Sequence, residues 1–231
     1  MCTVTFLPTS NTNFIFTSNR DETPLRKTLP PKVYHENGVA IRYPKDELAG
    51  GTWIGTSEKN RIVCVLNGGY QSHERQPPYK LSRGVIVKNV LSAIDVLAYI
   101  KSFDFTNIEP FTLLVLEWNT INLNFMQFVW TGKNLDIKEL PNKPQIWSSS
   151  NLYNPKMKKE RENWFNEWLE KTHELTQEKV LAFHSNENLG TKATSIKMKR
   201  PFIETVSITS IQKGQDKVTM DYVDFLKTKK S

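Results

Sequence analysis

The order of the apolar patterns along the chain limits the fold more than any other feature. Apolar and polar residues alternate in short runs near both ends and in the middle of the chain, and helical spacing occurs between these runs. The expected strands are residues 2–7, 13–17, 52–56, 61–66, 111–118, 123–130, 145–149, 192–198, 203–211 and 218–225, and the expected helices are 85–94, 93–102 with Ser92 as its cap, 155–171 and 176–184. Strands therefore come in blocks without βαβ alternation, which favours an antiparallel α+β layer fold.

Two stretches interrupt this pattern. Residues 23–50 contain four prolines and are expected to be irregular covering structure. Residues 70–82 are polar and proline-rich, and we expect them to form a mobile loop over a site. Because no repeat, low-complexity tract or linker separates the parts, residues 1–231 are expected to form a single domain.

Composition excludes several classes of protein. Of the 231 residues, 38% are hydrophobic and 24% are charged, so neither disorder nor a collagen-like repeat is expected. The sequence has no run of about 18 apolar residues, so no membrane span is expected. The net charge of +7 comes largely from residues 156–161, 197–200 and 227–230, which no recognised nucleic-acid module accompanies. These clusters fit solvated faces and a basic tail, so no nucleic-acid partner is expected.

Cysteine usage draws attention to residue 2. The chain contains only Cys2 and Cys64, which suits a reducing compartment such as the cytoplasm, and no secretory signal is recognised. Cys2 follows Met1, and a small residue there normally permits removal of the methionine. Cys2 would then carry a free amine and a thiol, whose reference pKa values of about 8 and about 8.5 suit a base beside a nucleophile. The alternative is an incidental cysteine.

The sequence indicates no metal or cofactor site. The histidines show no ligand spacing, and neither cysteine belongs to a CxxC pair; the histidines are His35, His73, His173 and His184. His184 falls near the end of an expected helix and is interpreted as a cap or surface residue. No glycine-rich nucleotide-binding motif is present, so no cofactor is expected.

Residues 18–22 (Ser-Asn-Arg-Asp-Glu) directly follow the second expected strand. A hairpin would place them beside the start of the first strand and hence beside Cys2. Arg20 would favour the Cys2 thiolate, and Asp21 would orient the amine. A surface salt bridge at a hairpin end is the open alternative, and such pairs contribute little to stability.

The same segment carries a family resemblance. Residues 19–22 (Asn-Arg-Asp-Glu) are the motif that names the NRDE family, also called the transport and Golgi organisation 2 family. Further segments are similar to the family in the order in which they occur along the chain. They are residues 1–2, before the motif, and residues 50–55, 65–67, 82–84, 97–99, 150–151 and 190–192 after it. The chain therefore resembles this family over nearly its whole length.

The NRDE family resembles, more remotely, the N-terminal-nucleophile hydrolases, and among them the cysteine group that contains penicillin V acylase and bile salt hydrolase. This resemblance implies an α+β fold of the αββα type, a four-layer sandwich with two antiparallel sheets. It also implies Cys2 as the nucleophile, Asp21 as its carboxylate partner, Asn67 as the oxyanion-hole asparagine and Asn151 as a second asparagine of the site.

Two positions depart from the hydrolase group. Ser18 stands where the group has an arginine, and Arg20, two positions later on the same face of an extended segment, would substitute for it. Lys192 stands where the group has its late active-site arginine, and lysine keeps the charge without the planar fork.

The resemblance implies hydrolysis of a small amide or acyl substrate by Cys2, without a cofactor. The alternative is a non-catalytic ligand-binding or trafficking protein for haem or a lipid or acyl ligand, in which Cys2 would be a soft ligand. The expected partners are therefore small-molecule amide, acyl or haem-like ligands, and the oligomeric state is left open.

Overall fold

The structure of the protein is a computed structural model that describes residues 3–215 and 217–227. Within it the chain divides into two compact units. Unit 1 comprises Met1–Arg26 and Asn142–Ser231, and unit 2 comprises Lys27–Pro141. The prediction of a single domain over residues 1–231 stays a prediction.

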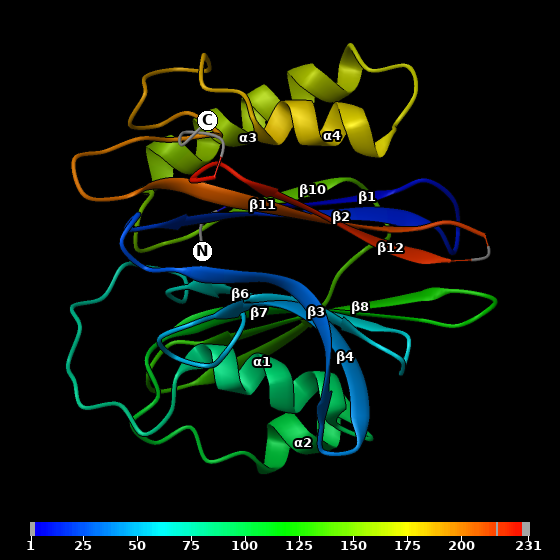
Figure 1. The fold of residues 1–231 in the computed structure, drawn as a ribbon, viewed down its shortest axis with the longest axis vertical. Helices are drawn as coiled ribbons and strands as arrows, with labels where there is room; N and C mark the ends of the chain where they lie inside the picture. The colour runs from blue at the N-terminus through cyan, green and yellow to red at the C-terminus, as the bar shows by residue number, and fades with distance from the viewer. Residues whose placement is uncertain (1–2, 216, 228–231) are drawn as a thin grey trace. The chain divides into compact units, whose positions relative to one another are not determined.

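Unit 1 is built on an antiparallel sheet whose described strands have the order β10-β1-β2-β11-β12 (Figure 1). The strands are β1 (Thr3–Pro8), β2 (Phe14–Glu22), β10 (Gln145–Ser148), β11 (Glu204–Lys213) and β12 (Val218–Asp224). Helices α3 (Pro155–Glu170) and α4 (Gln177–His184) pack on one face of this sheet. Asn154 caps α3 and Thr176 caps α4, each through a side-chain oxygen that accepts a backbone N–H.

The core of unit 1 lies between this sheet face and the two helices. Leu7 and Ile15 are paired across β1 and β2, and they pack with Phe165 of α3 and Val180 and Phe183 of α4. The partly buried Trp164 and Trp168 pack against the same cluster, which confirms the predicted apolar face of α3. This packing fixes the helices over the end of β1 and the start of β2.

Unit 2 is built on a second antiparallel sheet, whose described strands follow chain order from β3 to β9. The strands are β3 (Thr28–Glu36), β4 (Val39–Asp46), β5 (Ile54–Ser57), β6 (Arg61–Asn67), β7 (Phe111–Trp118), β8 (Leu123–Trp130) and β9 (Leu135–Glu139). Helix α1 (Arg83–Ser92) packs on β4, β5 and β6, with α2 (Val96–Ser102) beside it (Figure 1). The predicted α+β class with two antiparallel sheets is thus confirmed.

Several predicted elements are confirmed with small changes. Strands β7 and β8 have the predicted bounds, and helices α1, α3 and α4 lie where helical spacing predicts them. The predicted cap of α2 is wrong, because the residue that accepts the Ala98 N–H is Asp95 and not Ser92.

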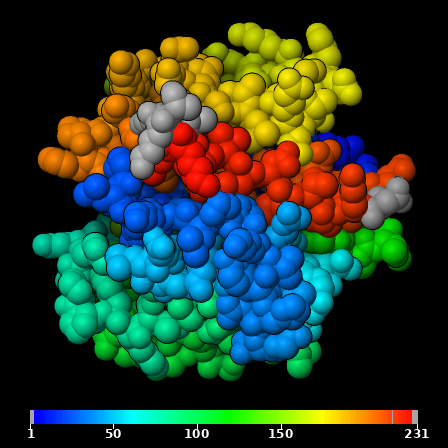
Figure 2. Space-filling view, viewed as in Figure 1, coloured from blue at the N-terminus to red at the C-terminus, as the bar shows by residue number. Residues whose placement is uncertain are grey.

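Two predictions about backbone structure are wrong. Residues 23–50 are not irregular but contain the β3–β4 hairpin, and β3 tolerates Pro30 and Pro31 because it is an edge strand whose register shifts between Leu29 and Lys32. In the view of Figure 2 these two strands are drawn in blue at the surface of unit 2. Residues 192–198 are not a strand, because turn hydrogen bonds hold them, including those from Thr194 and Ser195 to the carbonyl oxygen of Thr191.

Candidate active site

The register of the β1–β2 hairpin places the NRDE segment at the start of the chain. Thr3 pairs with Asn19, and the pairing continues to Pro8 and Phe14 at the turn. Along the chain, Cys2 directly precedes Thr3 and Arg20 directly follows Asn19. Cys2 itself lies outside the described residues, so its predicted role stays a prediction.

Asp21 is buried, with only 4% of its surface exposed. Its Oδ1 accepts a hydrogen bond of 2.6 Å from the Thr205 hydroxyl, and its Oδ2 accepts one of 2.9 Å from the Tyr153 hydroxyl. Opposite Asp21, the register of β11 shifts between Thr205 and Ser207, as at a β-bulge. Asp21 is therefore a fixed internal carboxylate, and the alternative of a surface salt bridge at this hairpin end is wrong.

Arg20 is also buried, at 3% exposure, and it extends from the opposite face of β2 because successive residues in a strand alternate. Its Nη1 donates a hydrogen bond of 3.1 Å to the carbonyl oxygen of Arg26. Ser18 and Arg20 lie on the same face of β2. Arg20 could therefore take the role of the arginine that the hydrolase group has at the position of Ser18.

Asn151 lies in the turn between β10 and α3. The backbone N–H groups of Leu152 and Tyr153 both donate to the carbonyl oxygen of Ser149, which makes the turn tight. Asn151 Oδ1 is buried and has no hydrogen-bond partner among the described residues. The same turn therefore delivers the Tyr153 hydroxyl to Asp21 and presents an unsatisfied amide oxygen two residues away.

Asn67 and Lys192 complete the predicted set. Asn67 is the last residue of β6 in unit 2, where Gly68, with φ of 86°, turns the chain and donates its N–H to the carbonyl oxygen of Pro110 at 3.1 Å. Lys192 is exposed in the segment between α4 and β11. In the same segment between α4 and β11, the guanidinium of Arg200 lies 5.4 Å from the ring centroid of Tyr153, which binds Asp21. Arg200 also donates to the carbonyl oxygen of Leu152 at 3.0 Å.

A family model described as Transport and Golgi organisation 2 matches residues 1–223. The chain belongs to the Transport and Golgi organisation 2 family. This confirms the resemblance carried by residues 19–22 and the segments that follow them. No curated protein sequence matches the chain.

Solved structures resemble this family member in fold. One is the Caenorhabditis elegans N-acylethanolamine-hydrolyzing acid amidase ortholog, with a TM-score of 0.62 and 14% identity over 91% of this chain and 92% of that chain. Another is a variant of conjugated bile acid hydrolase from Clostridium perfringens, with a TM-score of 0.51 and 11% identity over 98% of this chain and 93% of that chain. At such identities the likeness shows the fold alone, and it agrees with the αββα class that the resemblance predicts.

Two further findings bear on ligands of the Transport and Golgi organisation 2 chain. Among the described residues, no group of three or more His, Cys, Asp or Glu side chains is placed to hold a metal ion. In the same part of the chain, no helix is both long enough and apolar enough to cross a bilayer.

Sequence reasoning missed the residues that hold the NRDE segment from the other elements. Tyr153 and Thr205 bind Asp21, and His184 binds Asn19, from positions that are 132, 184 and 165 residues away along the chain. A tyrosine, a threonine and a histidine at these spacings match no local motif. The nearest signal is that Tyr153 lies two residues after Asn151, which the family resemblance does single out.

His184 corrects the prediction of a cap or surface residue, because it is fully buried. Asn19 Nδ2 donates to the carbonyl oxygens of His184 and Ile196 at 3.0 and 2.9 Å, which leaves Asn19 Oδ1 as an acceptor at 2.6 Å from His184 Nδ1. Nδ1 therefore carries the proton, and Nε2 accepts from the Thr5 hydroxyl at 2.8 Å. Burial, together with the nearby positive charge of Arg161, lowers the pKa of His184 to about 3.

This burial makes the stability of the fold depend on pH. The folded pKa of His184 lies below its unfolded value, so stabilisation is complete above the unfolded pKa of about 6.5 and is lost as the pH falls toward about 3. Between pH 6.5 and pH 5, the free energy of unfolding is expected to fall by about 2 kcal/mol on account of this residue. Urea unfolding at several pH values measures the slope, which His184→Gln should flatten and His173→Gln, at an exposed histidine, should leave unchanged. An equal slope in wild type and His184→Gln would contradict this account.

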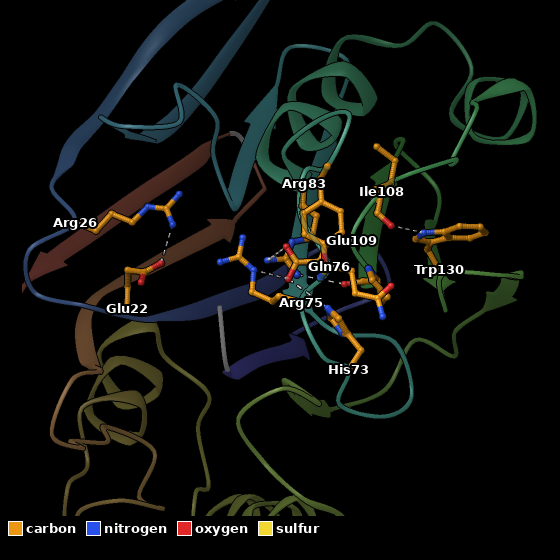
Figure 3. A network of polar contacts seen from close by, with 11 residues as sticks. Glu22, Arg26, His73, Arg75, Gln76, Arg83, Ile108, Glu109 and Trp130 are labelled. Atoms are coloured by element: carbon orange, nitrogen blue, oxygen red, sulfur yellow. Dashed lines mark hydrogen bonds and ion pairs between the residues drawn. The ribbon is translucent and has the colours of Figure 1, made fainter.

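In unit 2 a polar network holds the segment of residues 70–82 that precedes α1. Figure 3 shows His73, Arg75 and Arg83 pointing toward Glu109. Their nitrogen atoms lie 3.2, 3.5 and 3.1 Å from its carboxylate oxygens, and Glu109 is 6% exposed. The indole N–H of Trp130 donates to the carbonyl oxygen of Ile108 at 2.9 Å and so fixes the backbone next to Glu109. A single buried carboxylate therefore binds His73 and Arg75 within the segment and Arg83 directly after it.

Glu109→Gln is expected to increase the rate of tryptic cleavage after Arg75 by about 10-fold, because it leaves the Arg83 charge without its carboxylate. The matched control is Asp104→Asn, which removes the exposed ion pair between Asp104 and Lys80 of the same segment. Exposed pairs contribute little, so this control should change the rate by less than about twofold. Equal cleavage rates in the two variants would show that Glu109 does not anchor the segment.

Proposed function

We propose that this chain is an N-terminal cysteine amidohydrolase that acts on a small amide or acyl substrate. The observation that carries the proposal is the buried Asp21 carboxylate, held by Tyr153 and Thr205 where β2 runs beside the start of β1. A buried carboxylate at this point is suited to orient the free amine of a residue that directly precedes Thr3. The likeness in fold to an acid amidase and a bile acid hydrolase supports the same reaction class.

The proposed reaction proceeds through a thioester. After removal of Met1, the Cys2 amine takes the thiol proton and the thiolate attacks the substrate carbonyl carbon. Asn67 donates to the developing oxyanion, the C–N bond breaks, and the leaving amine takes up the proton held by the Cys2 amine. Water then hydrolyses the thioester, which releases the acid and restores the thiol. No cofactor or metal takes part, and a reducing location such as the cytoplasm, which keeps the thiol free, belongs to the proposal.

Asn151 has a specific part in this proposal. Its buried Oδ1 has no partner among the described residues and is an acceptor without a donor. An unsatisfied acceptor costs about 1–3 kcal/mol, and a substrate N–H or the Cys2 amine would satisfy it. Asn151 would thus hold the substrate amide, and Arg20 would provide the positive charge beside the nucleophile. Lys192 remains in the proposed set only as an exposed cation.

Intact mass and alkylation kinetics test the proposal. Mass spectrometry should show a chain that lacks Met1, and iodoacetamide at about pH 7 should modify Cys2 far faster than a free cysteine. Cys64 is the internal control, because it is fully buried and should react slowly. Alkylation of Cys2 should abolish hydrolysis of N-acyl p-nitroanilides of varied chain length. Retained Met1, or full hydrolysis after Cys2 is alkylated, would overturn the proposal.

The second candidate function is a non-catalytic carrier of a haem, lipid or acyl ligand. It is favoured by the exposed position of Lys192, which does not supply the buried cation of a hydrolytic site, and by a family description that names transport rather than hydrolysis. A carrier predicts a ligand that co-purifies with the chain, is seen by native mass spectrometry or absorbance, and is lost in Cys2→Ala. A ligand-free protein that turns over acyl anilides would exclude this function.

A further inference from the structure

The structure buries the side chain of Arg161, although the sequence pattern predicts that this residue lies on an exposed face of its helix. It belongs to a basic segment of α3 that alternates with glutamates, yet its side chain is 0% exposed and ranks among the largest fully buried side chains of the described residues. Long charged side chains are almost never fully buried unless they are paired. The position of Arg161 therefore requires an explanation that amphipathic spacing does not provide.

Within the described part of the chain, the hydrogen bonds of Arg161 go to uncharged acceptors. Its Nε donates to the Ser148 hydroxyl at 3.1 Å, and its Nη1 donates to the carbonyl oxygens of Thr194 and Ser195, both at 2.6 Å. Its Nη2 donates to the Thr3 hydroxyl. No carboxylate among the described residues lies within ion-pair distance of its guanidinium, although such pairs are recorded for other arginines. A buried charge without a counter-ion is costly, so an apolar side chain would fill this space at lower cost if packing were its only role.

The contacts of Arg161 lead to the candidate nucleophile by two routes. Thr3, whose hydroxyl it binds, is covalently joined to residue 2. Its guanidinium carbon also lies 4.0 Å from the ring centroid of Tyr153, whose hydroxyl donates to Asp21 at 2.9 Å. One side chain thus supports the residue after the nucleophile and the tyrosine that positions Asp21.

We propose that Arg161 is a positioning residue for the N-terminal nucleophile. It fixes Thr3 and Tyr153, and its unpaired positive charge favours the neutral amine and the thiolate of Cys2. This inference rests on the proposed function, because it assumes that residue 2 becomes the first residue of the chain.

The size of the electrostatic effect follows from chain geometry. A covalent path of one peptide unit joins the Thr3 hydroxyl to any amine on residue 2, and such a path, with the hydrogen bond to Arg161, spans no more than about 9 Å. With an effective dielectric constant of about 20, a positive charge at this distance lowers an amine or thiol pKa by about one pH unit.

The other groups around Arg161 leave its charge largely uncompensated. His184 of α4 is neutral, and Arg200 is a second cation against Tyr153. Arg20, on the other face of β2, is a third cation and directly follows Asn19, the partner of Thr3. Asp21 of β2 is the opposing anion, and hydroxyl groups already bind both of its oxygens. The described groups that face the start of β1 therefore carry a surplus of positive charge.

The test measures the pH dependence of Cys2 alkylation in the full chain after intact mass has shown that Met1 is absent. Iodoacetamide rates are followed on the N-terminal peptide over about pH 5.5 to 9.5, with Cys64 as the slow internal reference. In wild type, the apparent thiol pKa should lie about one pH unit below its reference value of about 8.5. A wild-type value at or above the reference would overturn the inference without any variant.

Two variants separate the charge from the packing. Arg161→Gln should raise the apparent pKa of Cys2 by about one pH unit, whereas Arg161→Lys, which keeps the charge, should retain a lowered value. A purely structural role predicts that both variants lose stability with no displacement of the pH profile, and that result would overturn the proposal. If Arg161→Gln does not fold, the wild-type titration still decides the matter, because an apparent thiol pKa at or above its reference value overturns the inference. Failure of the proposed function is distinguishable, because it appears as retained Met1 or as hydrolysis that is insensitive to Cys2 alkylation.

Discussion

Asp21→Asn is expected to lower the rate of amide hydrolysis by about 10³-fold while the chain remains folded. Asparagine has the shape of aspartate, and the hydroxyls of Tyr153 and Thr205 can each donate or accept, so both contacts with residue 21 persist in part. What is lost is the negative charge that, in the proposed mechanism, orients the Cys2 amine. Steady-state hydrolysis of N-acyl p-nitroanilides gives the change in kcat, and thermal unfolding confirms that the fold persists.

The control for this prediction lies in the same sheet. Asp221 is exposed on β12, and Asp221→Asn removes the same charge from the surface. It should change kcat by less than about twofold, because exposed charges are screened. If Asp21→Asn and Asp221→Asn have the same activity, Asp21 has no part in the reaction.

The second large effect concerns stability. Asn19→Ala is expected to lower the free energy of unfolding by about 3–5 kcal/mol, because it removes three buried hydrogen bonds and leaves their partners unsatisfied. These partners are the ring Nδ1 and carbonyl oxygen of His184 and the carbonyl oxygen of Ile196. Urea unfolding followed by tryptophan fluorescence measures the change.

The matched substitution is Asn124→Ala on β8, where the side chain is exposed. A surface change of this kind is expected to alter stability by no more than about 0.5 kcal/mol. A loss below about 1 kcal/mol in Asn19→Ala would mean that water or another group replaces the asparagine. The hydrogen bonds from Asn19 to His184 would then not be needed to hold the end of α4.

Local pattern predicts much of this fold because many contacts are local. The hairpin of β7 and β8 alternates apolar residues around an Asn-containing link, so short-range spacing suffices to locate both strands. The β3–β4 hairpin escapes the same reasoning because Pro30 and Pro31 signal a break, and only its place at the edge of the sheet makes them tolerable. Residues 192–198 look like a strand, but turn hydrogen bonds to the carbonyl oxygen of Thr191 hold the start of this stretch, and Met198 at its end bonds to Thr205 of β11.

The site is predictable only as far as the motif extends. Residues 19–22 identify Asp21 as a candidate, and the hairpin register brings it beside the start of β1. Tyr153, Thr205 and Arg161 are set by tertiary packing, since they come from a turn, a strand and a helix that lie far away in the chain. Arg161 is the clearest case, because its helical spacing predicts a solvated face and its contacts require the assembled sheet.

The edge position of the prolines in β3 has a consequence for assembly. Proline has no N–H to donate, and the register shift at Pro30 and Pro31 breaks the regular spacing of free backbone groups along this margin of the sheet. A β-strand from another molecule that aligned here would lose successive hydrogen bonds at its centre. We therefore expect the β3 edge to resist the addition of a strand from another molecule and the growth of fibrils. The double substitution Pro30→Val and Pro31→Thr should make this edge able to pair with such a strand.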